Sequence, residues 1–145
     1  MTSQAGEAAK AIVRRNTEDV QGKGDFALFE MLFADDFVDH TPQPGVSADK
    51  DGVRLLYKGL RASFPDLRPE IGWQTVEGDL VTTYKIYHGT HLGAFLGLAP
   101  TGRSIAFEAL DAMRVQNGMI TDHWGVGNLY SLVQQIKGED GPAIG

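Results

Sequence analysis

The sequence predicts an α+β domain in which a strongly bent antiparallel sheet forms a cone and packs against three N-terminal helices and one C-terminal helix. Three observations support this prediction. Apolar residues recur at helical spacing up to residue 64, runs rich in Thr, Val, Ile and Tyr follow, and one more helical pattern ends near residue 136. Helices that precede a run of strands are typical of this architecture, and the concave face of such a sheet encloses a pocket.

The length indicates a single domain over residues 1–145, with a core at roughly 5–137 and a flexible tail at 138–145. A domain of this size buries about 68–70% of its unfolded surface, so its core needs no covalent staple. The chain has no cysteine, which excludes disulfides, thiolate metal sites and cysteine nucleophiles.

The charge and hydropathy patterns limit the partners. A net charge of −6 argues against binding to nucleic acid or to an anionic membrane. No apolar run approaches the ~20 residues of a membrane span, and residues 1–10 lack the pattern of a signal peptide. We therefore expect a soluble cytoplasmic protein.

The helices are predicted from apolar spacing and from their caps, with Asp25 capping the second helix and Asp49 the third. The expected bounds are residues 4–21, 26–33 and 50–64. Between the second and third helices, residues 34–36 read as a turn. Residues 37–40 read as a short strand that Pro42 ends.

Strand-like runs occupy the second half of the chain. The expected strands are residues 67–76, 80–91, 105–115 and 119–126. Asn117-Gly118 lies between the last two, and this dipeptide is the strongest short-range signal for a hairpin. Asn128 can cap a last helix, which Gly138 ends.

Asp111 is the first candidate for chemistry, because alternation along its strand places it on an otherwise apolar face. The residues that share this face are Ile105, Phe107, Ala109, Met113 and Val115. A carboxylate buried there must be paired, protonated or next to a wet cavity. It is therefore either a general acid/base with a tuned pKa or a structural hydrogen-bond acceptor.

His123 is the second candidate, one strand away from Asp111. The ideal two-residue hairpin pairs residue 112 with residue 123, which places Asp111 opposite Trp124 instead. A β-bulge near Gly125 or Gly127 would bring His123 to the face of Asp111 and create an acid/base dyad.

Further polar residues surround this pair. Lys85 and Tyr87 share one face of their strand. If that face points inward, Lys85 stabilises an enolate or pairs with Asp111. If it points outward, Lys85 is a solvated surface residue. His40 ends a strand and His91 opens a loop, so both are expected at the rim of the pocket. Four scattered histidines without a short-spaced pair predict no metal site.

Residues 93–103 have the composition of a functional loop, with three glycines and a proline. Phe95 and Leu96 have no partner in a neighbouring helical or strand pattern. Apolar residues at the tip of such a loop often close over a pocket, so we expect this loop to rim the pocket.

Several segments resemble the SnoaL-like polyketide cyclases, within the wider cone-shaped superfamily of ketosteroid isomerase and scytalone dehydratase. The matching segments are residues 33–40, 64–67, 89–91, 95–98, 100–103, 118–120, the His123-Trp124 pair and Gln134-Gln135. Their order covers roughly residues 12–137. The resemblance implies a cone-shaped α+β fold and a small, largely apolar, polyketide-like or other keto-containing ligand.

The resemblance also implies chemistry. Cyclases of the family close a ring by an intramolecular aldol step without a metal or an organic cofactor, and relatives include cofactor-independent hydroxylases. Their acid/base carboxylate directly follows the His-Trp pair, where this chain has Gly125. Residues expected to contact the substrate are His40, Lys85, Tyr87, His91, Phe95 and Trp124, beside the catalytic candidates Asp111 and His123.

Two classes of function stay open from the sequence. One is an enzyme that performs acid/base chemistry next to a carbonyl, such as an aldol cyclase, a hydroxylase, or a lyase, hydrolase or isomerase of the superfamily. The other is a ligand-binding protein without catalysis, which Gly125 favours. The resemblance also implies a homodimer, because sheets of this superfamily commonly pair across their open faces. The polar-aromatic strand face with Trp73, Tyr84 and Ile86 fits such a contact.

Overall fold

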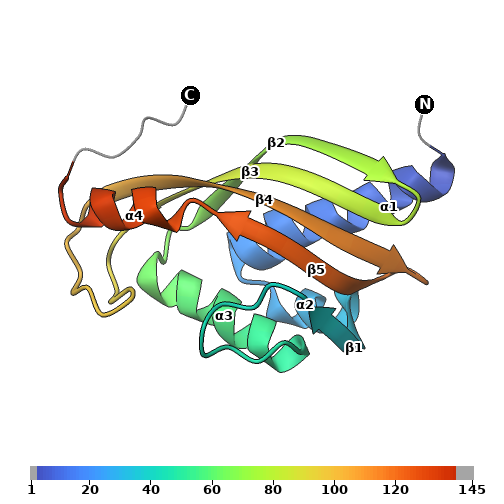
Figure 1. Ribbon diagram of the computed structural model, residues 1–145, viewed down its shortest axis with the longest axis horizontal. Coiled ribbons are helices and arrows are strands. Elements are labelled where there is room, and N and C mark those ends of the chain that lie inside the picture. The colour runs from blue at the N-terminus through green and yellow to red at the C-terminus, as the bar shows by residue number, and fades with distance from the viewer. Residues whose placement is uncertain (1–2, 140–145) are drawn as a thin grey trace.

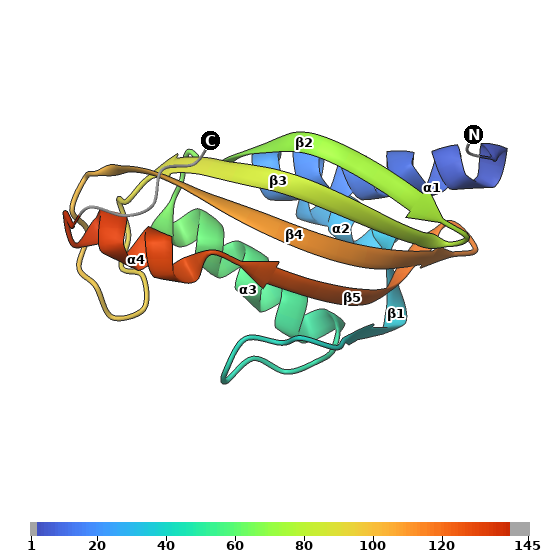
Figure 2. The same ribbon diagram turned by 45° about the horizontal axis from the view of Figure 1, so that its top comes forward.

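The computed structural model describes residues 3–139 and has the predicted α+β architecture, with helices α1, α2 and α3 on one face of a curved five-stranded sheet (Figures 1 and 2). The elements are α1 (Gln4–Arg15), the π-helix η1 (Asn16–Gln21), α2 (Phe26–Leu32), β1 (Phe33–Asp39), α3 (Lys50–Ser63), β2 (Arg68–Glu77), β3 (Leu80–Thr90), β4 (Ser104–Gln116), β5 (Met119–Gly127) and α4 (Leu129–Ile136). From residue 140 on, the tail expected to be flexible lies outside the described residues. No helix among residues 3–139 is long and apolar enough to span a membrane.

The helix caps follow the sequence closely. Asp25 accepts the N–H of Leu28 at 3.1 Å, and Asp49 accepts the N–H of Gly52 at 2.9 Å, as predicted. The first helix differs from the prediction, because its second half widens into the π-helix η1 after Arg15. π-helical turns are rare and occur frequently at functional sites.

The sheet has the strand order β1-β5-β4-β3-β2 and is mixed, whereas the sequence predicted antiparallel strands alone. β1 pairs in parallel with β5 at the edge of the sheet, with an irregularity between Phe33 and Val38. The turn predicted at residues 34–36 is wrong, because these residues continue β1 through that irregular stretch. Phe33 at the start of this stretch and Phe37 near its end are buried and hold the strand against the core.

The β4–β5 hairpin contains the bulge that decides which residues face the helices. Beyond the turn, Val115 pairs with Ile120, but Arg114 pairs with Asp122, so Thr121 is the extra residue. The register therefore shifts by one position, and His123 lies opposite Met113 instead of Ala112. The predicted bulge exists at Thr121, not near Gly125 or Gly127.

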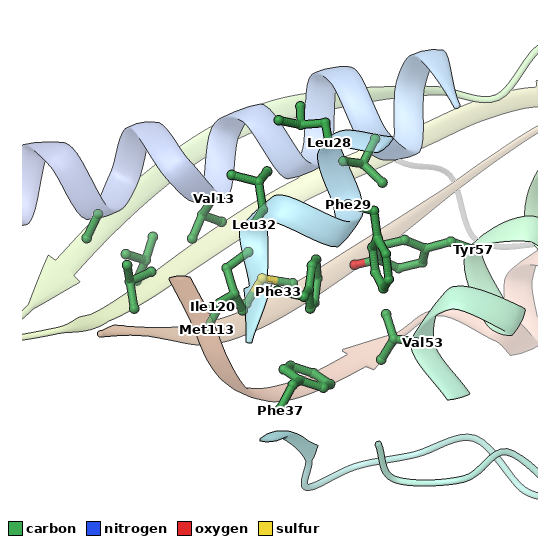
Figure 3. Packing of buried hydrophobic residues seen from close by; sticks show 14 residues of the cluster. Val13, Leu28, Phe29, Leu32, Phe33, Phe37, Val53, Tyr57, Met113 and Ile120 are labelled. Carbon is green, nitrogen blue, oxygen red and sulfur yellow. The ribbon is translucent and has the colours of Figure 1, made fainter. Parts of the chain in front are cut away.

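Two buried apolar clusters hold the helices to the sheet. The first centres on the ring of Phe29, which stacks on Phe33 at 4.4 Å and meets Tyr57 edge-on at 5.9 Å (Figure 3). The second joins β3, β4 and α4 and includes Tyr87 and Phe107. The two clusters leave a cavity between them, which both line.

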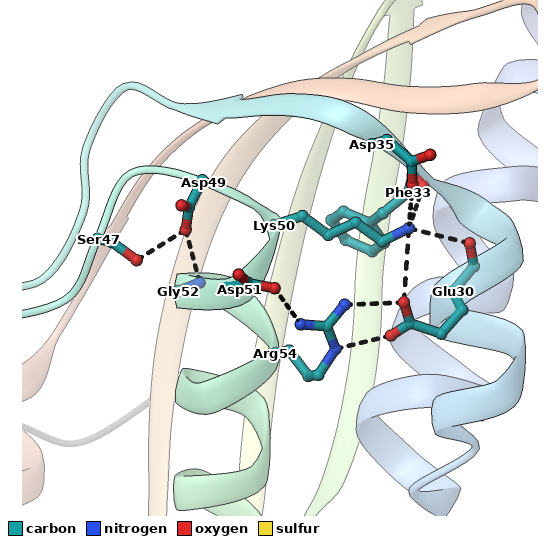
Figure 4. Close-up of polar contacts among 9 residues, drawn as sticks. All are labelled: Glu30, Phe33, Asp35, Ser47, Asp49, Lys50, Asp51, Gly52 and Arg54. Atoms are coloured by element: carbon teal, nitrogen blue, oxygen red, sulfur yellow. Dashed lines mark hydrogen bonds and ion pairs between the residues drawn. The ribbon is translucent and has the colours of Figure 1, made fainter.

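A buried lysine fixes α3 to the end of α2. The ammonium of Lys50 donates to the carbonyl oxygens of Glu30 at 3.1 Å and Phe33 at 2.9 Å, which are carbonyls at the C-terminal end of α2 (Figure 4). Arg54 donates to both carboxylate oxygens of Glu30 at 2.7 Å. These contacts hold the N-terminal half of α3 against β1, and α3 forms one wall of the cavity.

The sheet face away from the helices carries aromatic side chains. Trp73 stacks on Tyr84 with ring centroids 5.8 Å apart and stays 48% exposed. The homodimer expected to cover this face stays a prediction.

Truncation of the central ring tests the first cluster. Phe29 is fully buried, so Phe29→Ala should lower the free energy of unfolding by about 3–5 kcal/mol through lost burial and a residual cavity. Met31 lies on the same helix but is 71% exposed, and Met31→Ala should stay within about 0.5 kcal/mol of the wild type. Urea denaturation measures both, and similar values for the two variants would contradict this packing.

Candidate active site

A cavity of about 360 Å³ lies between the sheet and the helices. Its walls are mostly apolar, and the aromatic rings that line it are Phe33, Phe37, Tyr57, Tyr87, Phe95 and Phe107. Polar side chains enter at a few points, among them Gln21, Asp39, Asp111 and His123. An apolar cavity of this size with a few convergent polar groups is typical of a small-molecule site.

His123 and Asp39 form a hydrogen-bonded dyad on the cavity wall. They lie side by side in the parallel pairing of β1 with β5, and His123 Nδ1 is 2.9 Å from Asp39 Oδ1. An ionised carboxylate only accepts hydrogen bonds, so Nδ1 carries the proton and Nε2 of the neutral ring is left with its lone pair. This arrangement prepares His123 Nε2 to accept a proton.

The environment of Asp39 keeps it ionised. Burial raises the pKa of its carboxyl group, but the hydrogen bond and charge of His123 and the hydrogen bonds from Thr41 outweigh burial, so the pKa of Asp39 is below its usual value. The N–H of Thr41 donates to Asp39 Oδ1 at 3.0 Å. Asp39 therefore both orients the imidazole ring and stabilises its protonated form.

Gly125 makes room for the imidazole. A β-carbon at this position would lie 2.8 Å from His123 Nε2 and 3.1 Å from Asp111 Cβ, so another residue would force the ring to move. Gly125 pairs with Asp111 across the two strands, and its N–H donates to the hydroxyl of Thr41 at 2.9 Å. Asp111 and His123 thus flank one glycine on the cavity wall.

Asp111 forms an ion pair with Lys85. Lys85 Nζ is 2.8 Å from Asp111 Oδ2, and the two side chains are 0% and 7% exposed. Burial by itself lowers the pKa of Lys85, but the attraction of the Asp111 carboxylate outweighs it and raises the pKa well above its usual value. Lys85 therefore stays protonated, and the alternative of a solvated surface lysine is wrong.

The π-helix η1 supplies the remaining partners of this pair. Lys85 Nζ lies 3.4 Å from the hydroxyl of Thr17 and 3.3 Å from Gln21 Oε1, which also accepts the hydroxyl of Tyr87 at 3.1 Å. Because the ammonium needs an acceptor, the amide oxygen of Gln21 faces it. Within residues 3–139, the hydrogen bonds of the Gln21 side chain involve its oxygen and not its amide nitrogen. Gln21 also lines the cavity.

The remaining predicted contacts divide into two groups. Tyr87 and Phe95 line the cavity as expected, whereas His40, His91 and Trp124 do not. The ring of His40 stacks on that of Trp124 at 4.3 Å. The bulge at Thr121 turns His123 toward the cavity, and strand alternation then turns Trp124 to the other face, so the predicted place of Trp124 in the pocket is wrong.

His91 is a buried structural residue. Its Nδ1 lies 3.0 Å from the hydroxyl of Thr101 and accepts the backbone N–H of the same residue at 3.3 Å. The ring thereby holds together the two ends of the loop 91–103, so the prediction of a rim position is wrong. The loop itself lines the cavity through Phe95 and Leu96, which confirms its predicted place.

Sequence reasoning missed Asp39, Gln21 and Tyr57 as cavity residues. Asp39 shares the strand parity of buried Phe37, which is the one local signal for it. Gln21 faces the cavity because of the π-helix, which no simple pattern predicts. Within residues 3–139, no group of three or more Asp, Glu or His side chains is arranged to hold a metal ion.

The profile of the SnoaL-like polyketide cyclases matches residues 11–136. The chain belongs to this family. This SnoaL-like protein is also similar to nogalonic acid methyl ester cyclase of Streptomyces nogalater, with 30% identity over 84 residues. That match spans 57% of this chain and 63% of the relative, which is less than two thirds of its length.

Solved structures share the fold of this SnoaL-like protein. IdmH of Streptomyces antibioticus, assigned as a polyketide cyclase, has a TM-score of 0.79 and 28% identity over 89% of this chain and 98% of its own. AclR of Streptomyces galilaeus, assigned as a hydroxylase, has a TM-score of 0.82 and 24% identity over 97% of this chain and 86% of its own. The likeness to AclR shows the fold alone.

The buried ion pair of this SnoaL-like protein can be tested by removing one charge or both. Lys85→Met leaves Asp111 buried without its cation and should lower the free energy of unfolding by about 3–5 kcal/mol. The double variant Lys85→Met/Asp111→Leu removes both charges and should recover a large part of that loss. A double-mutant cycle from urea denaturation measures the coupling, and additive effects would contradict a stabilising ion pair.

The depressed pKa of Asp39 predicts a dependence of stability on pH. Its carboxylate contributes stability that is complete above its unfolded pKa and is lost as the pH falls through the lower folded pKa. The stability difference between wild type and Asp39→Asn should therefore shrink as the pH falls from about 5 to about 2. Asp36→Asn, an exposed position on the same strand, is the control. A difference that is constant with pH would contradict the assignment.

Proposed function

We propose that this protein is an acid/base catalyst that removes a proton next to a carbonyl in an apolar, polyketide-like substrate and closes a ring by an intramolecular aldol step. The observation that carries this proposal is the His123–Asp39 dyad on the wall of the apolar cavity, with Nδ1 bound at 2.9 Å and Nε2 beside Gly125. This is the arrangement of a general base oriented by a carboxylate.

The proposed step conserves atoms and electrons. His123 Nε2 takes a proton from the carbon next to a carbonyl, and the C–H electron pair forms an enolate. The enolate carbon then bonds to a second carbonyl carbon of the same molecule, and that C=O π pair moves onto oxygen. His123 returns its proton to this oxygen, so the product is an isomer of the substrate and the step consumes no oxidant or reductant.

Asp111 takes a supporting role in this proposal, although parity alone suggested it as the principal acid/base. Lys85 holds its carboxylate at 2.8 Å, and Asp111 flanks the same glycine as His123. Because Lys85 compensates its charge, Asp111 supports the site by forming the wall beside the imidazole and not by acting as the base. Gln21 lines the cavity, and in this proposal its amide nitrogen donates to a substrate oxygen.

The cavity and the relatives support the proposed substrate class. Aromatic walls around about 360 Å³ favour a fused-ring, largely apolar molecule, and the polar groups suit its ketone oxygens. One relative is a cyclase of nogalonic acid methyl ester, which supports a keto ester of that kind as the first substrate to test.

A ligand-binding protein without catalysis is the second candidate. It is favoured by Gly125, which stands where the resemblance implies the acid/base carboxylate of the cyclases. The two candidates differ in whether bound ketones exchange their α-protons.

Exchange of α-protons into D₂O separates the candidates. The wild type should accelerate exchange in 2-tetralone, a bicyclic ketone, and His123→Gln should reduce this rate by about 10²–10⁴-fold while binding is kept. NMR follows both exchange and binding. His40→Gln alters a histidine outside the cavity and should leave the rate unchanged.

The outcomes are distinct. Binding of 2-tetralone to the wild type without accelerated exchange would favour the non-catalytic candidate. Full exchange in His123→Gln with loss in Asp111→Asn would transfer the role of base to Asp111.

A further inference from the structure

The tip of the loop 91–103 is a two-residue turn with an unusual residue in it. Phe95 and Leu98 exchange both backbone hydrogen bonds, at 3.0 and 2.8 Å, and enclose Leu96 and Gly97. Both enclosed residues have positive φ, 48° for Leu96 and 78° for Gly97. This is the conformation of a type I′ turn, which favours Asn, Asp or Gly at its first central position.

The same chain contains the favoured version of this turn. Asn117 and Gly118 join β4 to β5 with φ of 53° and 76°, nearly the values of Leu96 and Gly97. Leu96 and Asn117 are the two residues other than glycine with positive φ within residues 3–139. A leucine has steric conflicts in this region that asparagine tolerates better, so Leu96 lowers the stability of its turn.

Packing of the fold does not explain the leucine. Leu96 is 67% exposed, so it contributes little to the core. Leu96 nevertheless lines the cavity together with Phe95, and Phe95 in turn packs against Phe64 with ring centroids 5.4 Å apart. The apolar side chain is therefore held at the cavity, where a ligand can bury it.

We propose that Leu96 is a specificity-determining residue, which covers the apolar end of a fused-ring substrate and is retained in a strained conformation for that contact. This inference rests on the proposed function only in requiring that the cavity binds an apolar ketone. It requires no particular base. Strained residues that persist in a fold are commonly found at ligand-binding sites, which supports a role for this one.

The variant Leu96→Asn separates the two effects of this residue. Asparagine suits the turn, so the melting temperature should rise by about 1–4 °C. The apolar contact is lost, so the affinity for 2-tetralone should fall by about 5–20-fold. The affinity for cyclohexanone should change less than twofold, because its single ring has no second ring to reach the loop.

Two control variants complete the test. Asn117→Leu places leucine in the equivalent turn at the opposite end of the sheet, as Figures 1 and 2 show, and should lower the melting temperature without changing affinity. Leu96→Met keeps an apolar side chain at the cavity and should keep the affinity for 2-tetralone within about twofold.

The outcomes distinguish this inference from the proposed function. Leu96→Asn with wild-type affinity for 2-tetralone, or with a lowered melting temperature, would overturn the role of Leu96. The wild type could bind 2-tetralone without exchanging its α-protons while Leu96→Asn still weakens that binding. This result would overturn the catalytic proposal and leave the role of Leu96 intact.

Discussion

The extra residue Thr121 shifts the pairing of β5 against β4 by one position, and every side chain from Asp122 onward exchanges faces as a result. His123 consequently turns toward the helices, where β1 brings Asp39 within 2.9 Å. In an unbulged hairpin Trp124 would stand opposite Asp111 and fill this space. The cavity, the dyad and the glycine between the two ionisable groups all depend on this one irregularity.

The charges in the apolar cavity occur as compensated pairs. Asp39 has His123 and the N–H of Thr41, and Asp111 has Lys85. The Asp39–His123 pair joins β1 to β5, which are far apart in sequence. Lys85 also contacts Thr17 and Gln21 of the π-helix, so the polar contacts help to specify how β1, β5 and η1 meet the rest of the sheet. A site built in this way holds ionised groups in an apolar cavity and tolerates few substitutions of them.

Local sequence signals predicted most of the fold and part of the site. The caps Asp25, Asp49 and Asn128 and the Asn117-Gly118 turn act within four residues, and the structure confirms them. Strand parity placed Asp111 on the cavity wall.

Features that depend on distant partners were not predictable in this way. The parallel pairing of β1 has no local pattern, so the turn predicted at residues 34–36 is wrong and Asp39 was missed. No local signal placed the bulge at Thr121, which brings His123 to the cavity as expected and turns Trp124 away from it. The dyad joins residues 84 positions apart, a separation that only the assembled sheet explains. During synthesis on the ribosome, β1 is therefore complete well before β5 emerges, and a nascent chain stopped before residue 123 lacks the imidazole that pairs with Asp39. Chains that end before residue 123 therefore lack the dyad, which forms only once the β4–β5 hairpin has docked beside β1.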